Sequence, residues 1–275
     1  MRRIESSSSI NTYKQCPRKY YYRYIKKLPD KFNIYAVRGN IVHSALEHFF
    51  KIDPKTIKNY KTDIQLKLEN LFDLFWVQNK EKLISLEMNV EDLNEFYLDS
   101  REMLAKWAQR LVKKIDQTIK EDNFVEAFSR LTPESEEEFT STKIGVRGFV
   151  DAIYQNGDKI HVVDYKTSRK DIITPEYALQ AGIYAILIHE ARDIMPEKVS
   201  FDFLKGEVRD IIVDEELIKN TLFEIEQIHA STDSDDPREY KRKPSGLCKW
   251  SNERGSGECA YFNICNPRNP EKWED

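Results

Sequence analysis

Two aspartates and a lysine flank a candidate hairpin turn in the middle of the chain: Asp151, Asp164 and Lys166, with Asn156-Gly157 between them. Asn-Gly between β-rich runs is typical of a type I′ turn, because both central positions of that turn need positive φ. With this turn, Asp151 would lie opposite Val162, and Asp164 would be its diagonal neighbour, about 7–8 Å away on the same face. Side chains alternate along a strand, so Lys166 would project from that face as well.

These three groups suit the hydrolysis of a phosphodiester bond. Two carboxylates supply hard oxygen ligands for Mg²⁺ or Mn²⁺, which would neutralise charge on the phosphate and lower the pKa of a bound water. The lysine would orient that water or stabilise the developing charge. The alternative is an edge hairpin with ordinary surface charges. Against it, Asp164 follows the mainly apolar run 160–163, where an unpaired carboxylate is costly to bury.

Four cysteines lie near the two ends of the sequence: Cys16, Cys248, Cys259 and Cys265. Four thiolates can hold either a zinc ion or a [4Fe–4S] cluster, and a polar tail with little core of its own would gain stability from such a metal. The alternative is four unrelated free cysteines. We expect a bound metal that joins the ends of the chain.

Composition limits the class of protein without naming its partner. The chain has 275 residues, 33% of them charged, and a net charge of −4, which does not by itself indicate a nucleic-acid-binding protein. Residues 1–31 hold nine Lys or Arg against two acids, and their tyrosines could stack on bases or pack in a core; we favour the core for most of them. We find no secretory signal and no apolar run approaching ~18 residues, so we expect a cytoplasmic protein with no membrane partner.

Hydrophobic periodicity predicts a mixed α/β (α+β) fold. Helices are expected over 9–27, 35–50, 55–86, 90–121 and 175–192, with another after a cap at Asp214; strands are expected from about Glu136 through the hairpin and over 198–204 and 207–213. The tail from Thr232 is expected to be rich in loops. We predict one domain over 1–275, with a helical insertion over 55–130, a catalytic core over 135–231 and metal-binding ends over 1–35 and 240–275.

Three further residues are candidates for the same site. Gln180 and Tyr184 are i, i+4 neighbours on one face of an expected helix and could contact the site or substrate phosphate. An amphipathic helix with incidental polar residues explains them equally well. His43 follows Gly39 on another expected helix. A lone histidine is more often a core residue, but from this helix its imidazole could reach a metal.

Together these motifs resemble the PD-(D/E)XK nuclease superfamily, in particular the RecB-like exonucleases with an iron–sulfur cluster. Those include the AddB nuclease domain and the CRISPR-associated adaptation exonucleases. The matching segments occur in the family's order: Ser7-x-Ser9-x3-Tyr13-x2-Cys16-Pro17-x2-Tyr20, Gly39-x3-His43, Gly148-x2-Asp151, Asp164-Tyr165-Lys166-Thr167 and Gln180-x3-Tyr184. The resemblance implies a restriction-endonuclease-like core with a small mixed sheet flanked by helices.

The resemblance also implies roles for individual residues. The catalytic metal would be bound by His43, Asp151, Asp164 and the backbone carbonyl of Tyr165. Lys166 would be the catalytic lysine, and Gln180 and Tyr184 would support the site or bind DNA. A [4Fe–4S] cluster would be held by Cys16, Cys248, Cys259 and Cys265. The usual final spacing is Cys-x2-Cys-x5-Cys, whereas ten residues separate Cys248 from Cys259 here, so zinc stays an alternative.

The expected activity is therefore that of a Mg²⁺- or Mn²⁺-dependent DNA nuclease, most simply an exonuclease on single-stranded ends. It would serve DNA repair, recombination, CRISPR adaptation or viral DNA processing, with a helicase or a CRISPR adaptation protein as a partner. The alternative is a non-catalytic DNA-binding or scaffold subunit of a DNA-processing complex.

Overall fold

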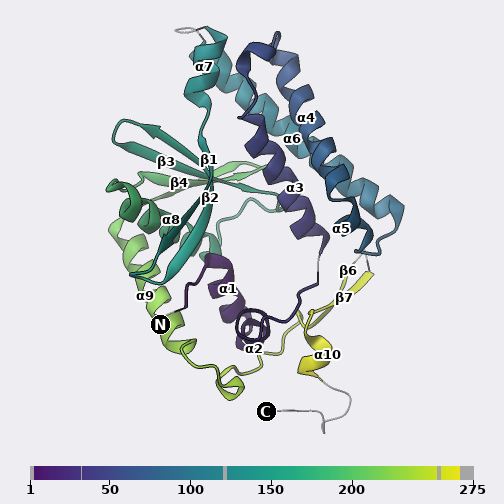
Figure 1. The fold of residues 1–275 in the computed structure, drawn as a ribbon, viewed down its shortest axis with the longest axis vertical. Helices are drawn as coiled ribbons and strands as arrows, with labels where there is room; N and C mark the ends of the chain where they lie inside the picture. The colour runs from purple at the N-terminus through teal and green to yellow at the C-terminus, as the bar shows by residue number, and fades with distance from the viewer. Residues whose placement is uncertain (1–2, 32, 120–122, 253–254, 267–275) are drawn as a thin grey trace. The chain divides into compact units, whose positions relative to one another are not determined.

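The strands around Asp151 and Asp164 belong to a five-stranded sheet in the computed structural model of the protein (Figure 1). The strands lie in chain order, with bounds β1 Glu134–Ser141, β2 Val146–Asn156, β3 Lys159–Lys166, β4 Lys198–Phe203 and β5 Val208–Ile212. β3 pairs antiparallel with β2 and parallel with β4, and β4 pairs antiparallel with β5. This mixed sheet, together with the helices below, confirms the expected α/β class.

The structure describes residues 3–31, 33–119, 123–252 and 255–266, and the chain forms two units. The first unit comprises Met1–Lys31, Thr140–Gly148 and Asp214–Asp275, and the second comprises Phe32–Phe139 and Phe149–Val213. The domain bounds expected from the sequence stay a prediction. The part of the expected metal-binding C-terminal end beyond Asn266 lies outside the described residues.

The hairpin turn between β2 and β3 differs from the expectation. Asn156 pairs with Lys159, so Gly157-Asp158 occupies the two central positions. Gly157 has a φ of 61° and Asp158 has no positive φ, which is the pattern of a type II′ turn rather than type I′. Asn156 remains in the strand, where it gains one more cross-strand pair.

This turn also corrects the predicted register. Ala152 pairs with Val163, and one further step along the strands places Asp151 opposite Asp164 instead of Val162. The difference is an even number of residues, and therefore both aspartates still project from the same face of the sheet.

The second unit contains six α-helices among its described residues: α3 Ile34–Phe49, α4 Tyr60–Gln78, α5 Lys80–Ile84, α6 Val90–Thr118, α7 Phe124–Leu131 and α8 Pro175–Arg192. Asparagine side chains cap four of them by accepting a hydrogen bond from a backbone N–H of the first turn: Asn33, Asn59, Asn89 and Asn123. The bounds of α8 are those expected, with Pro175 in its first turn.

One predicted helix in this unit was wrong in extent, and another helix was not predicted. The single helix expected over 55–86 is split into α4 and α5, because Asn79 leaves the helical conformation and its side chain donates to the carbonyl of Phe75. The helix α7 was not expected, although Asn123 is its capping signal. The last residues of the helix expected to end at 121 lie outside the described part of the chain.

Helices α3, α4 and α6 pack side by side around an apolar core (Figure 1). The ring of Phe49 on α3 makes edge contacts with Trp107 on α6 and Phe128 on α7, with centroids 5.6 and 5.9 Å away. Offset and edge contacts of this kind add to the stabilisation from burial. The helix α8 instead packs on the sheet, through β4.

The first unit is built from short elements and one longer helix. Its elements are α1 Ser7–Gln15, α2 Pro17–Tyr20, a π-helical turn Tyr21–Ile25, α9 Glu215–Ser231, a 3₁₀ turn Pro237–Glu239, the strands β6 Lys249–Asn252 and β7 Gly255–Glu258, and α10 Phe262–Cys265. Asp214 caps α9 as expected. The strands β6 and β7 were not expected in the loop-rich tail.

The helix expected over 9–27 is interrupted at Cys16. This residue is extended, with φ −160° and ψ 108°, because the following Pro17 disfavours a helical conformation at the preceding residue. The tyrosines beyond the break form a buried cluster, as favoured: Tyr20, Tyr21, Tyr22, Tyr240 and Tyr261.

In the described parts of the chain, no helix combines the length and apolar character needed to cross a membrane.

The sheet also contains a histidine that stays neutral. The Ser200 hydroxyl donates to Asp210, so the Nε2–H of His161, 2.7 Å away, must donate to the Ser200 oxygen. Burial lowers the pKa of His161 from 6.5 to about 4, and the positive charge of Lys198 adds to the effect. In the unfolded chain the imidazole therefore takes up its proton at higher pH than in the folded chain. Stability is lost as the pH falls from about 6.5 to about 4.

The variant His161→Gln should lose less stability over this pH range than the wild type, since glutamine keeps a donor but does not titrate. The measurement is the urea midpoint of unfolding at pH 7 and pH 4.5 for both proteins. Carboxylates titrate in both, so they cancel in the comparison. Equal losses would contradict the assignment of the protonation to His161.

Candidate active site

Asp151 is held by partners from two other elements. The Nδ1 of His43, on α3, lies 3.0 Å from Asp151 Oδ1, and the backbone N–H of Tyr165, on β3, donates to Oδ2 over 2.8 Å. A carboxylate only accepts hydrogen bonds, so Nδ1 of His43 carries the proton. The Nε2 lone pair of a neutral imidazole is then left for a metal or another donor.

Asp164 is buried, with 3% of its surface exposed, and is oriented by the helix α8. Its Oδ1 accepts hydrogen bonds from Gln180 Nε2 and from the Tyr184 hydroxyl, each over 2.9 Å. Gln180 Nε2 also lies 2.6 Å from the Tyr184 oxygen. The i, i+4 spacing thus places both α8 side chains on the same carboxylate oxygen.

Lys166 is bound on the other side of this network. Its Nζ donates to Gln180 Oε1 over 2.9 Å and lies 2.6 Å from Asp164 Oδ2. The rings of Tyr177 and Phe201 lie near the ammonium, with centroids 5.1 and 5.3 Å from Nζ. Gln180 therefore links the lysine to the carboxylate, with its carbonyl toward Lys166 and its amide toward Asp164.

Burial and charge oppose each other at these groups. Burial raises the pKa of Asp164, and the neighbouring negative Asp151 adds to the rise, while the Lys166 ammonium works against it. Burial would lower the pKa of Lys166, but the negative charge of Asp164 raises it above its usual value. For His43, burial likewise lowers the pKa, and the charge of Asp151 and the hydrogen bond to it raise it overall. The charged groups of the site are thus stabilised against burial by the opposite charges beside them.

One oxygen of this site fits a cation. Asp164 Oδ2 is buried and accepts no hydrogen bond; the nearby Lys166 ammonium makes an ion pair without hydrogen-bond geometry. Together with Asp151, this oxygen supplies hard donors that suit Mg²⁺ or Mn²⁺, and His43 would join them once its Nε2 has lost its proton. Among the described residues, no three His, Cys, Asp or Glu side chains are arranged to hold a metal ion as they stand. The contact expected for the Tyr165 carbonyl stays a prediction.

The structure adds a residue that the sequence did not single out. Arg38 on α3 has 3% of its surface exposed, donates to the backbone carbonyl of Thr167 over 2.9 Å and pairs with Asp99 on α6. It holds the segment that follows Lys166. An arginine one residue before Gly39 carries no local pattern that would reveal this contact.

A cleft of about 520 Å³ opens beside His43 and Asp151. One wall is a face of α3 with Gly39, Asn40, His43 and Ser44, and the other is the start of β2 with Phe149 and Asp151. The cleft therefore reaches the candidate catalytic aspartate and histidine from one side.

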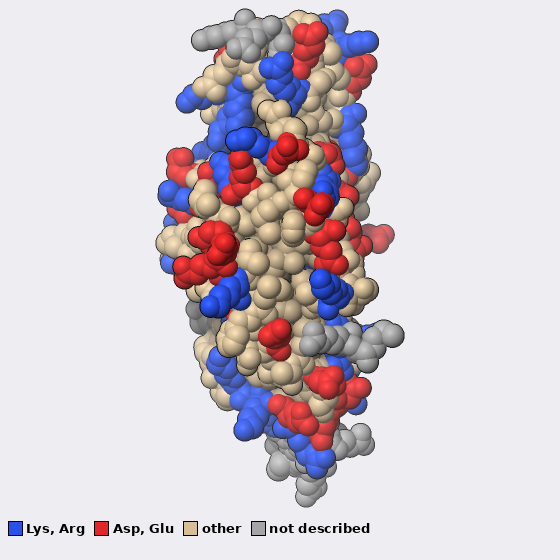
Figure 2. All heavy atoms as spheres, turned by 90° about the vertical axis from the view of Figure 1, so that its left-hand side faces the viewer, with Lys and Arg blue, Asp and Glu red and all other residues tan. Residues whose placement is uncertain are grey.

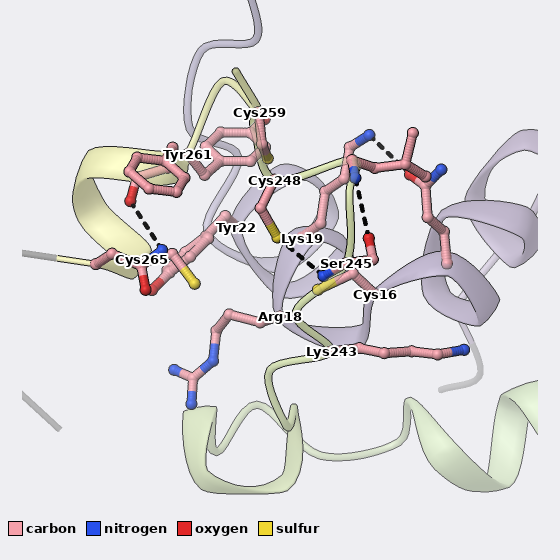
Figure 3. Close-up of a pocket in the computed structure, with 14 residues that line it drawn as sticks. Cys16, Arg18, Lys19, Tyr22, Lys243, Ser245, Cys248, Cys259, Tyr261 and Cys265 are labelled. Atoms are coloured by element: carbon pink, nitrogen blue, oxygen red, sulfur yellow. Dashed lines mark hydrogen bonds between the residues drawn. The ribbon is translucent and has the colours of Figure 1, made fainter. Parts of the chain in front are cut away.

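The four cysteines line one small pocket in the first unit (Figure 3). Cys16 comes from the junction of α1 and α2, and the other three come from the C-terminal segment. Burial raises the pKa of the Cys265 thiol; Arg242 and Arg18 lower it, while Cys16 and Cys248 raise it further. Four neighbouring cysteines are a donor set that a soft metal would stabilise once their thiols lose their protons.

The ten-residue separation between Cys248 and Cys259 is closed by the β6–β7 hairpin. Lys249 pairs with Glu258, and the backbone N–H of Cys259 donates to the Cys248 carbonyl over 2.9 Å. The inserted residues thus leave the two cysteines next to each other. The nature of the bound group stays a prediction.

Comparisons with known proteins place this geometry in a family. A solved structure of a protein from Eubacterium rectale, described as a proposed exonuclease, is similar in fold, with a TM-score of 0.52 and 13% identity over 89% of this chain and 85% of that one. A search of curated protein sequences finds no match. The sequence profile of the PD-(D/E)XK nuclease superfamily matches residues 5–266, and the chain belongs to that superfamily.

Proposed function

We propose that the protein is a metal-dependent deoxyribonuclease that acts on single-stranded DNA ends. The observation that carries this proposal is the network of hydrogen bonds and an ion pair that joins Asp164, Lys166 and Gln180. Beside it, Asp151 accepts from the Tyr165 backbone N–H and lines a cleft. A structural ion pair would need neither the histidine on Asp151 nor a cleft beside it. The family match and the similar fold of the E. rectale protein support the same class of reaction.

In this proposal the catalytic metal would be held by His43, Asp151, Asp164 and the carbonyl of Tyr165. When bound, Mg²⁺ or Mn²⁺ would neutralise charge on the phosphate and lower the pKa of a water. Lys166 would place its ammonium beside the attacking water or an oxygen of the phosphate. Gln180 keeps that ammonium oriented, and Tyr184 keeps Asp164 in position, so neither group must reorganise during the reaction.

Local groups rather than a broad positive field would recruit the DNA. Acidic and basic side chains are interspersed on the face drawn in Figure 2, and the net charge of the chain is −4. A long duplex bound through many phosphates needs many cationic contacts. A short single-stranded end needs fewer contacts, which supports end processing.

We also propose that Cys16, Cys248, Cys259 and Cys265 hold a [4Fe–4S] cluster, with zinc as the alternative. Support comes from the shared pocket and from the hairpin that brings Cys248 beside Cys259. The cluster would fix the C-terminal segment to the α1–α2 junction, since Cys16 is the one cysteine from the N-terminal end.

Replacing Lys166 with alanine should lower kcat by about 10²- to 10⁴-fold, because it removes the positive charge next to the reacting phosphate. The measurement is cleavage of end-labelled single-stranded DNA with Mg²⁺ or Mn²⁺, and EDTA should abolish it. Lys159→Ala, on the same strand but exposed and paired with Glu197, is the matched control and should cleave like the wild type. DNA binding without cleavage under any divalent metal would instead indicate a non-catalytic subunit.

Anaerobically purified protein should contain about four iron atoms per chain and absorb visible light. Serine at any one of the four cysteines should remove the iron and the colour, because a hydroxyl is a poor ligand for this cluster. Ser245→Ala changes a residue of the same pocket that is not a proposed ligand and should keep the iron. One zinc per chain would overturn the iron–sulfur assignment, and a cysteine variant with full metal content would remove that residue from the ligand set.

A further inference from the structure

The cleft beside the catalytic groups has uncharged walls away from its catalytic end. On α3 it is lined by Ala36, Gly39, Asn40 and Ser44, and on β2 by Phe149 and Val150. The ionisable side chains that line the cleft are those of His43 and Asp151. A phosphate bound along these walls would meet no cationic side chain. An uncharged ring with polar edges would enter at a small cost in hydration free energy.

Small residues on one face of α3 make room for such a ring. Residues 36, 39, 40, 43 and 44 follow the i, i+3, i+4, i+7 spacing of a single helix face. Alanine, glycine and serine at three of these positions leave the volume of about 520 Å³ open. This volume lies within the range of about 300–1,000 Å³ that is typical of ligand clefts.

Phe149 gives the opposite wall an exposed aromatic ring. It precedes Asp151 by two residues on β2, so its side chain projects to the same side of the strand, while Val150 between them is fully buried. The exposed fraction of Phe149 is 57%, although burying an aromatic ring is favourable. An exposed phenyl ring two residues from a candidate catalytic carboxylate is a surface on which a base can stack.

We infer that this cleft binds the nucleobase next to the scissile phosphate, with Phe149 stacking on the base and Asn40 contacting its polar edge. A base inside a duplex is stacked on its neighbours and paired at its polar edge, so it must leave the double helix before it can contact both Phe149 and Asn40. The cleft therefore selects single-stranded or frayed ends. This inference rests on the proposed nuclease function and names the part of the substrate that the site recognises.

The test combines a protein change with a substrate change. A fluorescent thymidine oligonucleotide is bound in the presence of Ca²⁺, and Kd is measured by anisotropy. A second set of oligonucleotides carries one abasic tetrahydrofuran unit, moved along the chain one position at a time. The proteins are the wild type, Phe149→Ala, Phe149→Tyr and Phe223→Ala. Phe223 on α9 is similarly exposed, at 61%, and does not line the cleft, so it is the matched control.

We expect Phe149→Ala to bind the intact oligonucleotide about tenfold more weakly, the effect of losing one stacked base. At one abasic position the wild type should lose a similar factor and Phe149→Ala should lose nothing more, because ring and base act as a pair. Phe149→Tyr and Phe223→Ala should bind like the wild type. Unchanged binding by Phe149→Ala, losses that add at every abasic position, or an equal loss in Phe223→Ala would overturn the inference.

Cleavage by the wild type with Mg²⁺ or Mn²⁺, measured in parallel, separates the two proposals. Cleavage that goes with Phe149-independent binding would overturn the base-binding cleft and leave the nuclease assignment intact. The paired loss of ring and base without any cleavage would support the cleft and overturn the catalytic proposal.

Discussion

The buried carboxylate of Asp164 is the constraint around which the second unit is organised. Removing a charged carboxylate from water costs several kcal/mol unless charges and hydrogen bonds compensate it. Here Gln180 and Tyr184 donate to one oxygen, and the Lys166 ammonium lies beside the other. The helix α8 therefore packs on the sheet with the face that carries Gln180 and Tyr184 toward Asp164. Lys166 lies two residues further along β3 and projects from the same face of the strand as Asp164.

The same requirement explains why the candidate site draws on several elements. Asp151 lies on the neighbouring strand, close enough to raise the pKa of Asp164, and it is itself bound by His43 on α3 and by the Tyr165 amide. Arg38, on the same helix as His43, binds the carbonyl of Thr167 just after Lys166. The helix α3 thus contacts both Asp151 on β2 and the residue that follows Lys166 at the end of β3.

In the first unit the corresponding constraint is the packing of tyrosine rings. The described helices of this unit other than α9 are short, and buried tyrosines form a cluster in which Tyr20 and Tyr240 are stacked at a centroid distance of 6.0 Å. The break at Cys16-Pro17 lets the chain turn within this cluster. The same break exposes the Cys16 side chain to the pocket that Cys248, Cys259 and Cys265 line.

Local signals in the sequence were enough to predict the bounds of α8, the cap at Asp214 and the mixed fold. These features depend on dihedral preferences, capping and periodicity, which act over a few residues. The hairpin register was predicted wrongly, because Asn156 pairs with Lys159 and the turn lies at Gly157-Asp158. The break at Cys16 was missed as well, although the proline carries that signal locally. The contact of Arg38 with Thr167, the closing of Cys248 onto Cys259 and the cleft beside Phe149 were decided only by the tertiary structure, because each depends on segments that meet through packing rather than through sequence neighbours.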